Sequence, residues 1–134
     1  MNTNNYRKSA CASLWFGDKI MLSKVLKKCH HQGLWNSPGG KVEKDEDIFD
    51  AVCREVCEET GCRLDKSMLG LVDCYLYPQR KLKVFFFTTT FNEDMFQHIK
   101  NTEPDKQSDW QLFTVKQALK LELLPSLRYY LKNL

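Results

Sequence analysis

Apolar and polar positions in the first third of the chain predict a β-hairpin followed by an irregular loop. Two apolar-rich segments, residues 9–16 and 19–25, flank Gly17-Asp18, and a short glycine-containing link of this kind favours a hairpin turn. Residues 27–33 are polar and predict a loop. Residues 35–40, WNSPGG, then combine a proline with two glycines, which indicates a special backbone path.

The spacing of apolar positions becomes helical between residues 47 and 60. Apolar residues recur at every fourth position and mark one face of a helix: Ile48, Val52 and Val56. Gly61 stands where a C-terminal cap belongs, and the acids Asp45 and Asp47 lie near the start, where the helix dipole favours negative charge. We therefore predict a helix over residues 47–60.

The remainder of the chain alternates between strand and helix patterns. Strands are expected at residues 68–77, 81–91 and 110–114, with Pro78-Gln79-Arg80 as the turn between the first two. Helices are expected at residues 115–120 and 124–131. The alternation predicts an α/β fold with a mixed β-sheet covered by helices, and residues 1–134 have the length of a single domain.

Composition places the chain among ordinary globular proteins, with 43% hydrophobic and 28% charged residues. No run approaches the roughly 20 apolar residues that a bilayer-spanning helix needs. The first ten residues, MNTNNYRKSA, lack the apolar core of a signal peptide. We expect a cytoplasmic protein.

Six cysteines without a CxxC pair are expected to be reduced thiols in such a protein. The alternative is a structural zinc site in which Cys53, Cys57 and Cys62 are joined by His30 or His31. The spacing of these residues is not that of a zinc finger or a zinc ribbon, so the zinc site is the weaker interpretation.

Charge is distributed unevenly along the chain. Residues 40–62 contain three Lys/Arg and eight Asp/Glu, a net charge of −5, and because the whole chain carries +3 the remainder carries +8. A dense acidic patch within a basic protein is typical of a site where metal cations meet a polyanion. A solvated acidic helix would give the same pattern.

Three glutamates lie on one side of the predicted helix, away from its apolar face: Glu55, Glu58 and Glu59. Like charges at this spacing repel by a few tenths of a kcal/mol per pair, so a protein that keeps them together usually has a cation to neutralise them. Ligands that are all oxygen favour Mg²⁺ or Mn²⁺. Arg54 lies within the cluster and could pair with Glu46 or a neighbouring carboxylate. An exposed acidic helix surface is the competing explanation.

The residues around this cluster resemble the Nudix box. Gly40 is followed after five residues by Glu46 and, after seven more, by Arg54-Glu55-Val56-Cys57-Glu58-Glu59-Thr60-Gly61-Cys62. Every charged and glycine position of that signature is filled. The one departure is the final position, Cys62, where an aliphatic residue is usual, and a buried thiol is apolar enough to replace it.

The resemblance implies a fold, a reaction and a set of residues. The fold would be an α/β/α sandwich in which the box forms a loop–helix–loop beside a mixed sheet. The reaction would be hydrolysis of a phosphoanhydride in a nucleoside diphosphate derivative, dependent on Mg²⁺ with Mn²⁺ as a substitute. The matching positions give these roles: Glu55, Glu58, Glu59 and the backbone of Gly39 as metal ligands, Arg54 as the residue that orients them, Glu46 as a supporting acid, and Glu58 or Glu59 as the general base.

Segments outside the box predict the substrate class. Trp35-Asn36 and the short chain are similar to the MutT-like nucleoside triphosphate pyrophosphohydrolases, which makes Trp35, Asn36, Gly40 and Lys41 substrate-binding residues. The amide of Asn36 offers both a donor and an acceptor to a base edge. The segment NTEP at residues 101–104, followed by Trp110, is similar to the tail of small nucleotide-directed members and adds Glu103 as a metal-facing carboxylate.

The remaining features leave alternatives open. No pair of acids follows Trp110, where residues 124–127 read LPSL, so a preference for oxidised purines is not favoured. ADP-ribose hydrolases of the family carry a proline near the position of Pro78, which a hairpin turn explains equally well. A non-catalytic Nudix-fold module usually loses box glutamates, and none is lost. We expect a small nucleotide as the partner, no membrane, no nucleic acid, and a monomer or homodimer.

Overall fold

The computed structural model describes residues 2–134, which build a seven-stranded mixed sheet. Its strands are β1 (Arg7–Phe16), β2 (Lys19–Lys24), β3 (Trp35–Asn36), β4 (Gly39–Lys41), β5 (Gly70–Tyr77), β6 (Leu82–Phe91) and β7 (Gln111–Thr114). Hydrogen bonds join them in the order β3-β2-β1-β6-β5, with β4 on β1 and β7 on β2. β1 and β6 run parallel, whereas the other pairs are antiparallel. The predicted mixed sheet is confirmed.

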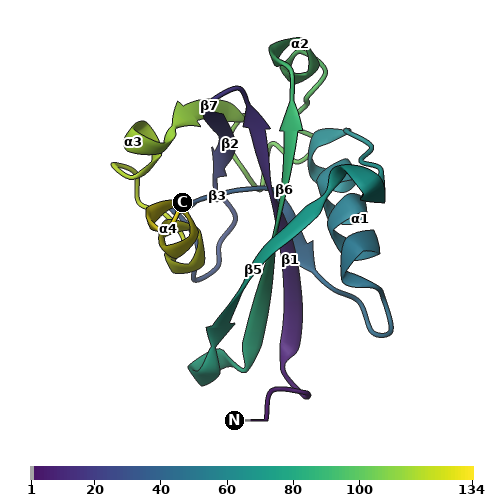
Figure 1. Ribbon diagram of the computed structural model, residues 1–134. Coiled ribbons are helices and arrows are strands. Elements are labelled where there is room, and N and C mark those ends of the chain that lie inside the picture. The colour runs from purple at the N-terminus through teal and green to yellow at the C-terminus, as the bar shows by residue number, and fades with distance from the viewer. Residues whose placement is uncertain (1) are drawn as a thin grey trace.

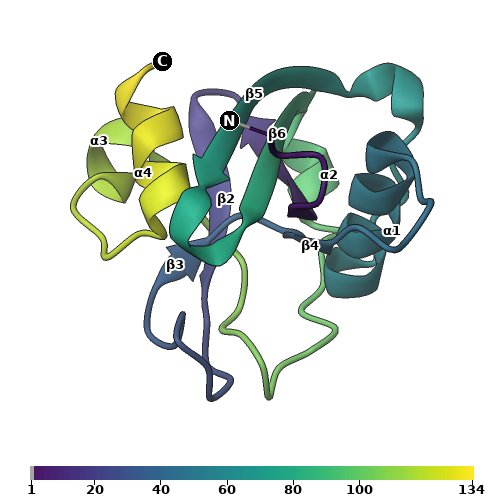
Figure 2. The same ribbon diagram turned by 90° about the horizontal axis from the view of Figure 1, so that it is seen from below.

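Helices cover both faces of this sheet. They are α1 (Ile48–Thr60), α2 (Glu93–Phe96), α3 (Val115–Ala118) and α4 (Pro125–Lys132), with 3₁₀ turns η1 (Lys66–Met68) and η2 (Pro78–Arg80). Figure 1 shows α1 on one side of the sheet and α3 with α4 on the other, and the view in Figure 2 agrees. The α/β/α arrangement is therefore confirmed. Over residues 2–134, no helix has both the length and the apolarity that a membrane crossing requires.

β1 lies at the centre of the fold and is buried on both faces. Ala10, Ala12, Leu14 and Phe16 are within the core cluster that contains residues of α1. Cys11, between them, belongs to the opposite cluster, which contains residues of α4. This alternation follows from the period of two in a strand. Because helices cover both faces, β1 has the nearly continuous apolar sequence of a central strand.

Local signals in the sequence account for the ends of the hairpin and of α1. Gly17 in the turn between β1 and β2 has a φ of 66°, which glycine adopts readily. Asp47 caps the N-terminus of α1, where its carboxylate accepts the N–H of Asp50 at 3.3 Å. Gly61 closes the helix in the left-handed conformation and donates its N–H to the carbonyl of Cys57.

Several element boundaries differ from the sequence expectation for local reasons. The strand expected at 68–77 begins at Gly70, because Asp65 caps the 3₁₀ turn η1 just before it. The strand expected at 81–91 begins at Leu82, because Lys81 adopts a left-handed conformation with a φ of 49°. The last two helices are shifted or shortened: α3 ends at Ala118, and α4 begins at Pro125 after Leu124 as N-cap. β3, β4 and α2 were not predicted, because two to four residues are too few for a periodic pattern to show.

Candidate functional site

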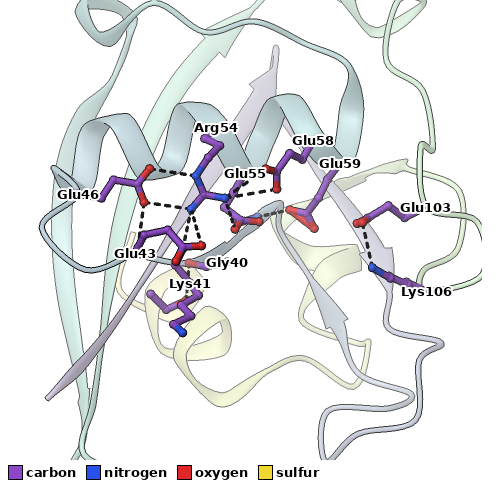
Figure 3. Close-up of polar contacts among 12 residues, drawn as sticks. Gly40, Lys41, Glu43, Glu46, Arg54, Glu55, Glu58, Glu59, Glu103 and Lys106 are labelled. Atoms are coloured by element: carbon purple, nitrogen blue, oxygen red, sulfur yellow. Dashed lines mark hydrogen bonds and ion pairs between the residues drawn. The ribbon is translucent and has the colours of Figure 1, made fainter.

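The glutamates of α1 are positioned by the buried face of the same helix. Val52 and Val56 have no exposed surface, so packing against the sheet fixes the rotation of α1 about its axis. A second constraint fixes the position of β4, which pairs with β1 through Cys11–Gly39 and Ala10–Gly40. Together these two constraints bring the carboxylates of α1 over the Gly39-Gly40 segment (Figure 3).

Gly39 and Gly40 are needed because two elements approach them closely. A Cβ atom at Gly39 would overlap the carbonyl oxygen of Ala10 and the backbone of Cys11. A Cβ atom at Gly40 would lie 2.5 Å from the carboxyl carbon of Glu55. The glycine pair therefore lets β4 contact β1 on one side and a glutamate of α1 on the other.

Arg54 forms hydrogen bonds with three glutamates of the carboxylate cluster. Its Nε and Nη2 each donate to one oxygen of Glu46 at 3.0 Å, a bidentate pair. Its Nη1 donates to Glu55 at 2.9 Å and to Glu58 at 3.3 Å, and Nη2 also donates to the carbonyl of Lys41 at 2.9 Å. The guanidinium holds the pKa of the Glu46 carboxyl below its usual range. The expected pairing of Arg54 with Glu46 and neighbouring carboxylates is confirmed (Figure 3).

Glu59 has a different environment from the rest of the cluster. Its Oε1 accepts the backbone N–H of Gly39 at 2.7 Å, and its carbonyl accepts the indole N–H of Trp110 at 3.3 Å. Burial, reinforced by the charges of Glu55 and Glu103 and opposed by the Gly39 N–H, raises the pKa of Glu59 to about 8. Without a cation nearby, this carboxyl therefore holds its proton at neutral pH.

The loop before β7 brings one more carboxylate to the cluster. Lys100 N–H donates to the carbonyl of Thr60 at 2.9 Å, and the Thr102 hydroxyl donates to the carbonyl of Glu58. These contacts use carbonyls at the C-terminal end of α1, which have no partner within the helix. Glu103 then lies close enough for its charge to raise the pKa of both Glu55 and Glu59. Its carboxylate pairs with Lys106 at 3.3 Å (Figure 3).

The cluster offers a divalent cation oxygen ligands without forming a closed cage. Among the residues that the structure describes, no three His, Cys, Asp or Glu side chains already form a set that could hold a metal ion. Mg²⁺ commonly binds through one or two carboxylates and completes its shell with water and substrate phosphates. A bound cation would favour the ionised form of Glu59, so the carboxyl groups beside Gly39 and Gly40 fit that mode of binding.

Two of the six cysteines pack in the core beside the helix that carries the carboxylates. All six are free thiols. Cys53 and Cys62 are partly buried and pack against the core cluster next to α1. The expectation that Cys62 replaces an aliphatic residue of the box agrees with this packing.

A cavity of about 230 Å³ opens beside Glu59. Its walls come from β1, β2, the β3–β4 segment, the end of β5 with η2 and β6, the loop at 103–110, and residues 124–126. Gly39, Gly40, Glu59 and Glu103 lie on its lining, so the cavity and the carboxylate cluster meet. Arg54, Glu55 and Glu58 on α1, and Glu46 in the loop before it, lie outside this lining.

The predicted substrate-binding residues divide into two groups. Asn36 and Gly40 line the cavity. The Oδ1 of Asn36 accepts the N–H of Ser37 at 2.9 Å. Trp35 is not on the lining, because its ring packs edge-to-face on Phe113 at 5.3 Å. The role of Trp35 in substrate binding stays a prediction. Lys41 is exposed beside the cluster and contributes its carbonyl to Arg54.

Sequence reasoning missed several polar residues of the cavity. They are Lys27, His31, Tyr77, Arg80 and Gln107. Arg80 Nη1 lies 3.3 Å from His31 Nε2, and burial, together with the charges of His30, Arg80 and Lys27, lowers the pKa of His31 to about 4. These residues come from separate segments and form no local motif. The excess of positive charge outside residues 40–62 was the only signal for Lys27 and Arg80, and the sequence contained none for the neutral Tyr77 and Gln107.

The family follows from comparison of the whole chain with known domains. A family model described as the NUDIX domain matches residues 6–134. The chain belongs to the Nudix family. Nudix hydrolases generally use a divalent metal ion, which agrees with the oxygen-rich cluster on α1.

Relatives of this Nudix chain include named bacterial enzymes. It is 40% identical over 58 residues to an 8-oxo-dGTP diphosphatase of Buchnera aphidicola, a match covering 43% of this chain and 47% of the relative. It is 37% identical over 75 residues to an 8-oxo-dGTP diphosphatase of Proteus vulgaris, covering 54% of this chain and 65% of the relative. The matches thus span about half to two thirds of the length of these relatives.

Solved structures of the family share the fold over nearly the whole chain. The crystal structure of a MutT Nudix hydrolase from Burkholderia pseudomallei superposes with a TM-score of 0.76. The sequence identity is 25%, and the match covers 94% of this chain and 95% of that one. The α/β/α arrangement of this Nudix chain is therefore that of MutT-like relatives.

Proposed function

We propose that this Nudix chain hydrolyses a nucleoside triphosphate to the monophosphate and pyrophosphate with the help of Mg²⁺ or Mn²⁺. The observation that carries the proposal is the position of Glu59 and Glu103 on the lining of the cavity, next to the carboxylates of α1. A nucleotide with its nucleoside in the cavity would extend its phosphates toward this cluster. The names of the bacterial relatives, 8-oxo-dGTP diphosphatase, support a triphosphate as substrate.

In this proposal Glu55, Glu58, Glu59 and the backbone of Gly39 would hold the cation. When bound, such a cation offsets negative charge on the phosphates and lowers the pKa of a coordinated water. Arg54 is a positioning residue, because its contacts with Glu46, Glu55 and Glu58 fix those side chains and leave it outside the cavity lining. Lys41 lies beside the cluster and is proposed to approach the phosphates.

Of the two candidates for the general base, we favour Glu59. Glu58 is exposed over 55% of its side chain and is held by Arg54, whereas Glu59 lines the cavity. A carboxylate that does not give both of its oxygens to the metal can take the proton from a water molecule. The N–H of Gly39 fixes Oε1 of Glu59 and leaves Oε2 as the other oxygen that can take a proton from water.

We do not extend the proposal to oxidised purines. Leu124 and Ser126 line the cavity, so the wall formed by residues 124–127 presents no carboxylate to an altered base.

ADP-ribose is the alternative substrate. Pro78 opens the 3₁₀ turn η2 between β5 and β6, which accounts for a proline there without reference to a substrate.

Removing divalent metal is expected to abolish hydrolysis. The carboxylates of α1 repel one another and attract phosphate only through a cation, so excess chelator should stop turnover and added Mg²⁺ or Mn²⁺ should restore it. The measurement is chromatography of the nucleotide products, which needs no metal-dependent coupling enzyme. Full activity in excess chelator would contradict the proposal, as would stoichiometric zinc bound by cysteines.

Cleavage is expected to yield a monophosphate and pyrophosphate, as the resemblance of the Trp35-Asn36 segment to MutT-like pyrophosphohydrolases predicts, and a cation held by the α1 carboxylates would offset charge on the phosphates. Product chromatography with the common dNTPs and NTPs, oxidised and methylated forms, and ADP-ribose decides this. Release of a diphosphate and inorganic phosphate would contradict the proposal. A clear preference for ADP-ribose, giving AMP and ribose phosphate, would replace it with the alternative.

A further inference from the structure

Gln107 carries a buried polar group that the fold does not use. Its residue is only 8% exposed, and it lies on the lining of the cavity. Its side-chain Nε2 has no hydrogen-bond partner among the described residues. Leaving a buried donor unpaired is unfavourable, and folded proteins rarely do so unless water or a ligand supplies the acceptor.

Hydrogen bonds hold the backbone of Gln107 at the edge of the cavity. Its N–H donates to the carbonyl of Glu103 at 3.1 Å, and its carbonyl accepts from Asn101 Nδ2 at 2.9 Å. It also forms an antiparallel bridge with Val25, which extends the end of β2. The neighbouring residue Ser108 donates its N–H to the carbonyl of Lys24 at 2.9 Å. The carboxamide is therefore presented to the cavity from a rigid segment.

The position of Gln107 suits recognition of the nucleoside and not of the phosphates. The phosphates must stay near the carboxylates of α1 and the cation they would hold. Gln107 is neutral, whereas phosphate recognition generally employs charged groups. Asn36 also lines the cavity, and its Oδ1 already accepts the N–H of Ser37. Lys27 and Arg80 add charged donors to the lining, whereas Nε2 of Gln107 is a neutral, buried donor without a partner among the described residues.

We propose that Gln107 is a specificity-determining residue that donates a hydrogen bond to an acceptor atom on the base of the bound nucleotide. The inference rests on the proposed function, since it assumes that a nucleotide occupies the cavity. A base edge with carbonyl or ring-nitrogen acceptors completes the hydrogen bonding of Nε2, and a ligand without a base leaves it unpaired. The energy of this contact is gained on binding, so it affects the affinity for the nucleotide more than the chemical step.

The test compares Gln107→Leu with the parent protein on two ligands that share a triphosphate. One is the nucleoside triphosphate that the parent hydrolyses best, and the other is ribose 5-triphosphate, which has no base. We expect the variant to lose about 10-fold in kcat/KM for the nucleotide, mainly through KM, as for loss of one buried hydrogen bond. The inhibition constant of ribose 5-triphosphate should change less than about 2-fold, because the contact that is lost involves only the base. Gln111→Leu, at an exposed position of β7, is the matched control and should behave like the parent.

Thermal unfolding without ligand separates this role from a structural one. Because Leu removes an unpaired buried donor, the variant should be as stable as the parent or more stable. Equal losses for the nucleotide and for ribose 5-triphosphate would overturn the inference, and so would an unchanged kcat/KM for the nucleotide. Gln107→Asn, which keeps the amide on a shorter side chain, gives a second measurement if the leucine variant fails to fold. If the parent hydrolyses no triphosphate, the proposed function fails. If the parent is active and Gln107→Leu has the parental profile, only the inference fails.

Discussion

Replacing Glu59 by glutamine is expected to reduce turnover at least ~100-fold, the scale on which loss of a metal-binding or general-base group is felt. Glutamine is nearly isosteric and its Oε1 can still accept the N–H of Gly39, so the fold should be retained. Stabilisation by added Mg²⁺ should become smaller, because a ligand that binds the native state raises stability by mass action. Steady-state kinetics and thermal unfolding with and without Mg²⁺ measure these effects.

The same substitution is expected to stabilise the metal-free protein at pH values above the ordinary range of a glutamate, and most strongly near pH 8. The pKa of Glu59 is raised to about 8, so the folded state binds its proton more tightly than the unfolded chain does. At pH values below the ordinary range of a glutamate, the carboxyl is protonated in both states and makes no difference. As the pH rises toward 8, the folded state loses stability relative to the unfolded state, and glutamine avoids this loss.

Denaturant unfolding in chelator at about pH 4 and about pH 8 tests the sign of this pH-dependent difference in stability. The stability of Glu59→Gln relative to the parent should increase between these two pH values by about 1 kcal/mol or more. Glu122→Gln, at an exposed position outside the cavity, is the control and should change neither stability nor turnover. Parental turnover and an equal response to Mg²⁺ in Glu59→Gln would show that Glu59 is not part of the metal site.

The sequence was sufficient to predict the elements that carry the carboxylates. The helical period of Ile48, Val52 and Val56 defines which face of α1 is buried, and Gly61 marks where the helix ends. The spacing of the glutamates places them close together, but Glu59 follows Val52 by seven residues and therefore shares its face of α1. The expected separation from the apolar face is thus wrong for Glu59, whose burial raises its pKa. The pairing of Arg54 with Glu46 was predictable because both lie within the same short motif.

The cavity could not be predicted because its walls are assembled by contacts between distant segments. Gln107 reaches the cavity through a bridge to Val25, and the loop that carries it is held by carbonyls at the end of α1. Arg80 meets His31 across 49 positions of the chain. The contact of Trp35 with Phe113 of β7 likewise joins segments far apart in the sequence. No local periodicity contains information about such contacts.

Alanine substitutions at Gly39 and at Gly40 are expected to act differently, the first on the stability of the fold and the second on turnover. At Gly39 the new Cβ would overlap the backbone of β1, which cannot move without disrupting the sheet, so the free energy of unfolding should fall by roughly 2–4 kcal/mol. At Gly40 the three atoms nearest to the new Cβ all belong to the carboxyl group of Glu55, which is the end of a flexible side chain. Gly40→Ala should therefore remain folded and lose at least ~10-fold in turnover, because it displaces a proposed metal ligand.

A double-mutant cycle identifies the cause of the loss in Gly40→Ala. If this substitution acts by displacing the carboxyl group of Glu55, adding it to Glu55→Ala should cost little further activity, because the displaced group is already absent. Gly70→Ala is the matched glycine control, since a Cβ atom there would make an ordinary contact with Thr88 at 3.8 Å. Additive losses in the double variant would mean that Gly40 acts on the phosphates or the backbone and not through Glu55. A stable, fully active Gly40→Ala protein would show that the close contact between this glycine and the glutamate has no part in catalysis.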